Sequence, residues 1–317
     1  MAAIEILGLE KTYKVGFWRK RPKRALKPLH LTVEEGEIFG FLGPNGAGKT
    51  TTLKLLMGLV FPTAGTARIL GRDWTEPEVK AQIGFLPEQP YFYDYLTAHE
   101  LLDYYGQLSG VPGKGRKQRI EQVLGQVGLH DVKGVQLRKF SKGMLQRAGI
   151  AQAILHNPKL VFLDEPMSGL DPLGRREVRD LMEQLKQDGK TVFFSTHILS
   201  DAEALCDRVA IIHKGELRSV GAVEDLTSSV EGKVEIMWQG TYIPASMKAL
   251  GGECHVTGDS VRAVIAEHQQ DAAIDVLRRE RIRLIAITPL RTSLEAYFVE
   301  KLQHVQTAAG SGVGSGL

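Results

Sequence analysis

Apolar residues in the first two thirds of the chain form short uninterrupted runs and longer stretches with helical spacing. The uninterrupted runs predict buried strands at residues 37–42, 159–164, 191–195 and 209–212. Weaker patterns predict strands at 4–13, 29–33 and 65–71, and helical spacing predicts helices at 51–57, 101–105, 120–124 and 142–156. Strands that are apolar throughout suit a largely parallel sheet with helices on both faces, so the expected fold class is α/β.

The pattern changes after Gly221. Thr227-Ser228-Ser229 suits a linker, and beyond it the spacing predicts strands at 233–238, 261–266 and 282–288 with helices at 271–280 and 293–304. We therefore expect a main domain over 1–226, with a helical subdomain at about 90–158, and a small α+β domain over 227–305. Residues 306–317 have too few apolar side chains to fold and are expected to be a flexible tail.

Composition indicates the compartment in which the protein is expected. The 317 residues are 43% hydrophobic with a net charge of +3, which is typical of a soluble globular protein and does not favour nucleic-acid binding. The first residues lack a secretory signal pattern, and no apolar run is long enough to cross a bilayer. Two cysteines, Cys206 and Cys254, are too few for a disulfide framework. We expect a cytoplasmic protein that reaches a membrane only through a partner.

Residues 16–24 form a dense basic stretch with two aromatic side chains, predicted to be a loop. Such a run is usually just solvated. Contact with anionic lipid headgroups or with a membrane partner is the alternative, because each basic residue near such a surface contributes about 1 kcal/mol.

A phosphate-binding loop follows the predicted strand at 37–42. Residues 43–50 match G-x-x-x-x-G-K-[ST], and the next residues are spaced as a helix. Glycines let backbone N–H groups face the phosphates, and the helix N-terminus adds partial positive charge. The ammonium of Lys49 would reach the β and γ phosphates, and the Thr50 hydroxyl would hold Mg²⁺. The predicted nucleotide-binding residues here are Gly43, Pro44, Asn45, Gly46, Ala47, Gly48, Lys49, Thr50 and Thr51.

Acidic residues at the end of a second apolar run complete the predicted chemistry. Asp164 is placed to bind Mg²⁺, and Glu165 to polarise the attacking water as general base. His197 follows the next apolar strand, whose end we expect beside that of Glu165, and is predicted to contact the γ-phosphate. The expected cofactors are ATP and Mg²⁺.

Together with residues 140–147 and 168–171, these motifs resemble the ATP-binding subunits of ABC transporters, in family order over about residues 4–222. The resemblance implies the family's P-loop NTPase core and a head-to-tail pair of subunits. Ser141 and Gly143 of the signature would then close over the partner's ATP, and Asp171 would belong to the loop that couples the two sites. Tyr13 matches the aromatic that stacks on adenine, although a core role at a strand end remains open.

Three departures from the family pattern affect the interpretation. The basic insertion at 16–24 lengthens the loop after Tyr13 and could displace that ring from the adenine. Phe140, Lys142 and Met144 replace three of the five usual signature residues, a variant that resembles drug-resistance-type bacterial exporters. The family's metal-bridging glutamine aligns with Glu88, while Gln89 lies one place later, so either residue is open as the metal ligand.

The leading hypothesis is the ATP-hydrolysing motor of a bacterial export complex, peripheral on the cytoplasmic face of the inner membrane. Its partners would be an integral membrane permease and a second copy of itself or a related ATPase subunit. The alternative is a soluble ABC ATPase that acts on ribosomes or nucleic acid without transport. The region 233–305 is expected to be regulatory or to support the dimer.

Overall fold

Two compact units, Met1–Val223 and Glu224–Leu317, make up the chain. The computed structural model describes residues 1–16, 21–227, 229–250, 253–291, 293–299 and 301. Within these ranges there is no helix of the length and apolarity that a bilayer span requires. The predicted tail at 306–317 lies outside the described residues.

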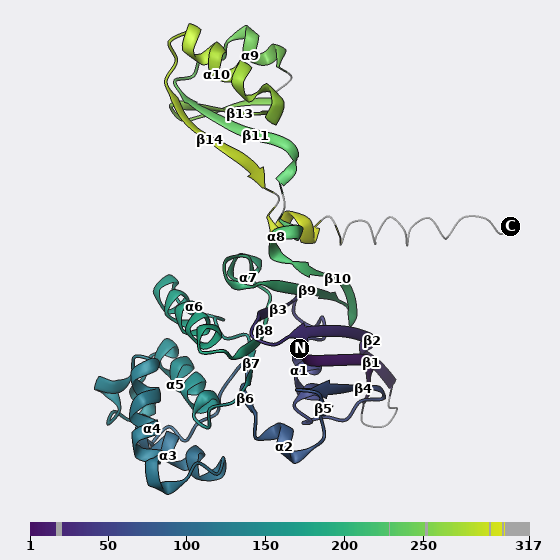
Figure 1. Cartoon of the computed structure of the whole chain (residues 1–317), viewed down its shortest axis with the longest axis vertical. Coiled ribbons are helices and arrows are strands. Elements are labelled where there is room, and N and C mark those ends of the chain that lie inside the picture. Colours follow the sequence, from purple (N-terminus) through teal and green to yellow (C-terminus); the bar gives the residue numbers. More distant parts are fainter. Residues whose placement is uncertain (17–20, 228, 251–252, 292, 300, 302–317) are drawn as a thin grey trace, which may run out of the picture. The chain divides into compact units, whose positions relative to one another are not determined.

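A six-stranded sheet forms the centre of the first unit (Figure 1), in the order β10-β9-β3-β8-β7-β6. All neighbouring pairs are parallel except β9 and β10. The strands are β3 Ile38–Leu42, β6 Ile83–Leu86, β7 Leu160–Asp164, β8 Thr191–Thr196, β9 Arg208–His213 and β10 Glu216–Ala222. The four uninterrupted apolar runs are therefore confirmed as buried parallel strands, whereas β6 and β10 were not predicted.

Phenylalanines fill the space on one face of this sheet. The ring of Phe193 lies 5.6 Å from Phe39, 5.6 Å from Phe41 and 5.5 Å from Phe162, centroid to centroid. All four rings are fully buried in one cluster with helix α1 (Lys49–Leu56) and the second sheet. This core fixes the ends of β3, β7 and β8 side by side, where the polar motif residues follow.

An antiparallel sheet of order β2-β1-β4-β5 packs on that core. Its strands are β1 Ala2–Val15, β2 Arg21–Glu34, β4 Ala64–Ile69 and β5 Arg72–Asp73. The predicted loop at 16–24 is wrong for its second half, because Arg21–Arg24 pair with Thr12–Val15 as the arms of a hairpin. Both faces of these arms are largely exposed, so they carry no apolar alternation to mark them as strands. Residues 17–20 lie outside the described residues, and the lipid contact stays a prediction.

Helices occupy the other side of the six-stranded sheet (Figure 1). They are α3 Ala98–Leu108, α4 Gly113–Gln126, α5 Lys142–Ile154, α6 Pro172–Gln187 and α7 Leu199–Leu205; shorter helices are α2 Pro77–Lys80 and α8 Val223–Leu226. The helix α3 begins with a capping box in which Thr97 and Glu100 satisfy each other's backbone N–H groups. The helices α3, α4 and α5 lie within the stretch of about 90–158, and a separate helical subdomain there stays a prediction.

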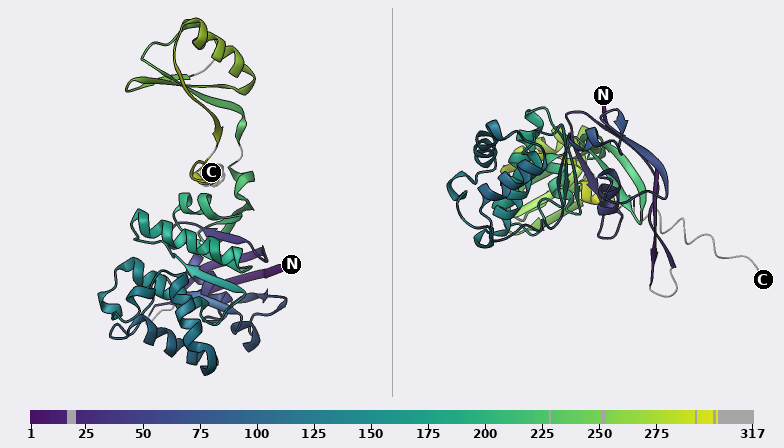
Figure 2. Two further views of the ribbon diagram at one scale, coloured as in Figure 1. Left: turned by 60° about the vertical axis from the view of Figure 1, so that its left-hand side comes forward. Right: turned by 90° about the horizontal axis from the view of Figure 1, so that it is seen from below.

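The second unit is a four-stranded antiparallel sheet, β12-β13-β11-β14, with two helices against one face (Figure 2). Its elements are β11 Ser229–Gln239, α9 Ala245–Ala249, β12 Glu253–Thr257, β13 Ser260–Ala266, α10 Gln270–Arg279 and β14 Leu284–Arg291. Ile236, Trp238, Val261 and Leu277 form a core of their own. The three predicted strands and the helix at 271–280 are confirmed; β12 and α9 were missed. Residues 294–299 are helical within the stretch predicted at 293–304.

Candidate functional site

The phosphate loop joins β3 to α1, as the strand–loop–helix pattern predicted. Gly46 and Gly48 have positive φ values of 79° and 112°, which other residues rarely adopt. A Cβ on Gly43 would lie 2.3 Å from the carbonyl oxygen of Ile212, so the loop can pack against β9 only with glycine there. The N–H groups of Gly43 and Ala47 donate to the carbonyl oxygens of Thr196 and Pro44, which fixes the loop at the N-terminus of α1. The first N–H groups of a helix have no partner within the helix and can meet an anion.

A cavity of about 690 Å³ opens above this loop. Predicted residues that line it are Tyr13, Asn45, Gly46, Gly48, Lys49, Thr50, Thr51, Glu88, Glu165 and His197. Gly43, Pro44 and Ala47 complete the loop behind this lining. The structure thus gathers residues from five separate stretches of sequence around one space large enough for a nucleotide.

Lys49 lines this cavity. Its side chain is 5% exposed, and the ammonium donates to the carbonyl oxygens of Gly43 at 2.7 Å and Pro44 at 3.3 Å. It also lies 3.1 Å from Oε1 of Glu165. The ammonium is thus held by the loop that is expected to hold the phosphates.

Asp164, Glu165 and His197 come together because β7 and β8 are neighbours, with Asp164 directly opposite Ser195. The imidazole Nδ1 of His197 lies 2.9 Å from Oε2 of Glu165. The other carboxylate oxygen of Glu165 is buried and makes no hydrogen bond within the described structure. This oxygen faces the Lys49 ammonium at 3.1 Å, so it would become available to a water molecule when Lys49 turns toward a phosphate.

The donor set around Asp164 fits Mg²⁺, which prefers oxygen ligands. Burial raises the pKa of the Asp164 carboxyl, while hydrogen bonds from Ser195 and Thr50 oppose that rise. The side chain is 2% exposed, and Thr50 brings its hydroxyl to the same place. A divalent cation would add to the positive charge that Lys49 already supplies near this buried carboxylate.

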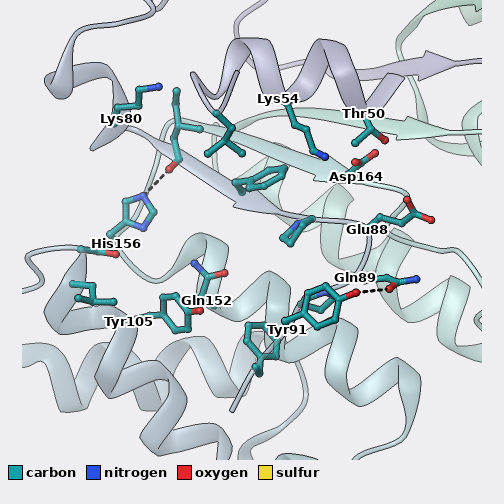
Figure 3. Close-up of a pocket in the computed structure, with 18 of the residues that line it drawn as sticks. Thr50, Lys54, Lys80, Glu88, Gln89, Tyr91, Tyr105, Gln152, His156 and Asp164 are labelled. Carbon is teal, nitrogen blue, oxygen red and sulfur yellow. Dashed lines mark hydrogen bonds between the residues drawn. The ribbon is translucent and has the colours of Figure 1, made fainter. Parts of the chain in front are cut away.

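Glu88 and Gln89 point in different directions. Glu88 lines the nucleotide cavity and also a neighbouring groove of about 1010 Å³, whereas Gln89 lines the groove. Figure 3 shows Glu88 beside Thr50 and Asp164, while the Gln89 side chain accepts a hydrogen bond from the Tyr91 hydroxyl at 3.1 Å. Of the two alternatives, the geometry favours Glu88.

Ser141, Gly143 and Asp171 lie together, but apart from the phosphate loop. They line a separate cavity of about 310 Å³. Ser141 accepts a hydrogen bond from the Met144 N–H at 3.2 Å and caps α5. Asp171 likewise caps α6, through the Gly174 N–H at 2.8 Å. This chain therefore does not bring its own signature to its own nucleotide cavity.

Several residues at the site were not predicted. Ser168 and Lys214 line the nucleotide cavity, as do Lys23 and Arg24 of the hairpin. Ser195 contacts both Asp164 and Glu165. The apolar run that ends at Ser195 marked a strand end, but only the pairing of β7 with β8 shows what its hydroxyl contacts.

Comparisons with known proteins show which family the chain resembles. Residues 26–168 match the family model described as ABC transporter. The chain is 43% identical over 304 residues to an uncharacterised ABC transporter ATP-binding protein of Synechocystis sp., covering 95% of this chain and 84% of that protein. It is 38% identical over 286 residues to the bacitracin transport ATP-binding protein BcrA of Bacillus licheniformis, covering 88% of this chain and 92% of that protein.

A solved structure shares the architecture of the first unit. It is a dimeric post-hydrolysis state of the ATP-binding cassette MJ0796 bound to ADP and Pi. The TM-score is 0.63 with 28% identity, over 69% of this chain and 98% of that one. The chain therefore belongs to the ATP-binding subunits of ABC transporters, and it is an ATPase built on the P-loop fold of that family, with a small α+β unit after it.

Proposed function

We propose that this chain is the motor subunit of a bacterial ABC exporter, in which two ATPase subunits close on two ATP molecules and drive a separate permease. The observation that carries the proposal is the division of the site between two cavities. One cavity holds the phosphate loop, Glu165 and His197, while Ser141 and Asp171 are exposed at the other. A second subunit in head-to-tail orientation would supply the missing side of each site.

The roles proposed for the residues of the first cavity follow from their contacts. The loop N–H groups and Lys49 bind the phosphates, and Tyr13 stands on the wall where the base would lie. Glu165 accepts a proton from the attacking water through Oε1, once Lys49 has left that oxygen for the phosphates. His197 holds the other oxygen of Glu165 and contacts the γ-phosphate.

Mg²⁺ would be held by the Thr50 hydroxyl and the Asp164 carboxylate, with Glu88 at the cavity edge as a third oxygen donor. When bound, the cation neutralises charge on the phosphate oxygens. The chain's own part is to keep these oxygens buried and oriented.

The groove beside the nucleotide cavity is the proposed contact with the permease. Its rim carries exposed apolar side chains, with Tyr91 88% and Leu108 66% exposed. Exposed aromatics around a groove are typical of protein interfaces. Because Glu88 lines both the groove and the nucleotide cavity, a segment seated there would respond to the state of the nucleotide.

Export is the direction we favour, and two observations support it. The signature variant at 140–144 resembles that of drug-resistance-type exporters, and one relative is named for bacitracin transport. The subunit would then work from the cytoplasmic face, attached through its permease.

Reconstitution tests this proposal. The chain is expressed with a polytopic membrane protein encoded beside it, and ATP hydrolysis and substrate efflux are measured in liposomes. Tyr91→Ala combined with Leu108→Ala should release the chain from the membrane, whereas Tyr242→Ala, an exposed tyrosine of the second unit, should not. The proposal would be contradicted if the chain binds no membrane protein and if its rate of ATP hydrolysis is the same with and without the co-expressed membrane protein.

A further inference from the structure

The hydroxyl of Ser195 contacts both acidic residues of the nucleotide site. Its Oγ lies 2.5 Å from Oδ1 of Asp164 and 3.1 Å from the backbone nitrogen of Glu165. Ser195 is the fifth residue of β8, opposite Asp164 in the parallel ladder, and it is fully buried. Both hydrogen bonds are therefore made out of contact with solvent.

The direction of each bond follows from the atoms. A carboxylate only accepts, so the single hydroxyl proton of Ser195 is donated to Asp164. A lone pair of the same oxygen then accepts the N–H of Glu165, which also lies 3.1 Å from the Ser195 carbonyl oxygen. An alanine at this position would offer neither side-chain bond.

Glu165 needs this support because its backbone is unusual. Its φ is +50°, in the left-handed region that non-glycine residues rarely adopt. Such a conformation costs on the order of 1 kcal/mol and persists only where neighbours impose it. The two Ser195 acceptors lie where the turn directs the N–H, and the Glu165 side chain is thereby sent toward Lys49 and His197.

We propose that Ser195 is a positioning residue that orients the Asp164 carboxylate toward the Mg²⁺ position and holds the turn that presents Glu165. The proposal rests on the roles proposed above for those two residues. Without the hydroxyl, Oδ1 of Asp164 loses its serine donor, while the Glu165 N–H keeps the Ser195 carbonyl. The larger effect is therefore expected on the Mg²⁺-dependent step.

The test compares the affinity for a non-hydrolysable ATP analogue in Mg²⁺ with that in EDTA. Residues that orient metal ligands typically contribute about 10–100-fold to metal affinity or activity, so Ser195→Ala should lower the Mg²⁺/EDTA affinity ratio by about that factor. Binding in EDTA should be unchanged. Ser195→Thr, which keeps the hydroxyl, should restore the ratio.

Thr191→Val is the matched control. Thr191 lies in the same strand, is 2% exposed, and its hydroxyl accepts from the Gly36 N–H at 2.9 Å, at the end of β8 away from the site. It should lower the thermal midpoint but leave the ratio as in the parent chain. Ser195→Cys has nearly the same shape, and its thiol is a weak hydrogen-bond donor. It should therefore also lower the Mg²⁺/EDTA affinity ratio, and it replaces Ser195→Ala in the test if that variant does not fold.

The proposal is overturned if Ser195→Ala, or Ser195→Cys in its place, keeps the parent ratio, or if Thr191→Val loses as much. Asp164→Asn separates this from the proposed function. If Asp164→Asn lowers the ratio and the Ser195 variant does not, only the role of Ser195 is wrong. If Asp164→Asn also leaves the ratio unchanged, the metal role proposed for Asp164 fails as well.

Discussion

The ammonium of Lys49 lies 3.1 Å from the carboxylate of Glu165, and the two side chains are only 5% and 7% exposed. Lys49 is the cation expected to reach the β and γ phosphates. Under the proposed roles, an incoming triphosphate must draw Lys49 away from Glu165. Nucleotide binding would therefore free the Glu165 carboxylate to act as general base only when a γ-phosphate is present for the water to attack.

Glu165→Gln should separate binding from hydrolysis. Glutamine keeps the size but cannot accept the water's proton, so hydrolysis should fall by roughly 10²–10⁴-fold. Because Lys49 no longer faces a charged partner, ATP affinity should rise. Titration calorimetry with a single-turnover assay measures both. Hydrolysis at the parent rate would contradict the general-base role.

Lys49→Ala should destabilise the fold as well as abolish ATP binding. It leaves the Glu165 carboxylate buried without its counter-charge, a change that costs about 3 kcal/mol in buried pairs. Combining it with Glu165→Gln should recover most of that free energy of unfolding. Urea denaturation of the four proteins gives the coupling as a double-mutant cycle. Strictly additive losses would show that the two groups do not interact.

Ser141→Asp should block closure of the dimer without harming the subunit. Aspartate is a good N-cap, so α5 should keep its stability, and the chain's own ATP site lies in another cavity. Its negative charge would face the partner's γ-phosphate. We expect normal ATP binding but no ATP-induced dimer on sizing chromatography of the Glu165→Gln background. Ser141→Asn, a neutral cap, is the control and should still dimerise.

His156 should make the fold sensitive to mild acid. Burial lowers the pKa of its imidazole, with a hydrogen bond to the Ile83 carbonyl opposing the shift. Between that lowered pKa and about 6.5 the unfolded chain binds more protons, so stability falls as pH drops through this window. His156→Gln should lose less of its thermal midpoint between pH 7.5 and 5.5. His255→Gln, at an exposed histidine, should behave as the parent chain; equal acid sensitivity in all three would exclude His156.

Stopping the chain after Thr227 should leave a folded ATP-binding protein. Each unit has its own buried cluster, and the cavities lie within residues 13–214. If the second unit is regulatory or supports the dimer, as we predict, the truncated protein should bind ATP normally but show altered turnover or dimerisation. Circular dichroism measures whether the truncated protein is folded, and nucleotide titration measures its ATP binding. Aggregation of the shortened chain would show that the second unit is needed for folding.

The sequence predicted those parts of the structure that follow from local patterns. The apolar runs at 159–164 and 191–195 became β7 and β8, because strands buried on both faces carry no polar residue to obscure them. The arms of the β1–β2 hairpin and the edge strand β12 were missed for the opposite reason. They are largely exposed, so charge and polarity cover their alternation.

Only the residues of the site that belong to local sequence motifs could be predicted. Lys49, Glu165 and His197 were each expected from a local pattern, and the structure places them within one cavity. The contacts of Ser195 depend on the register of β7 against β8, and the left-handed turn at Glu165 is a backbone property that no side-chain pattern encodes. Long-range register and local strain are what one sequence does not show.

The boundary at Val223 also bears on the order of events during translation. Every residue that lines the nucleotide cavity precedes Gly215, and the last strand of the central sheet ends at Ala222. A ribosome adds about 5–20 residues per second, so the first unit can be complete some seconds before synthesis reaches the end of the second. The nascent chain could thus hold ATP while still tethered to the ribosome, with bound nucleotide acting as a folding ligand for the enzyme that will later consume it.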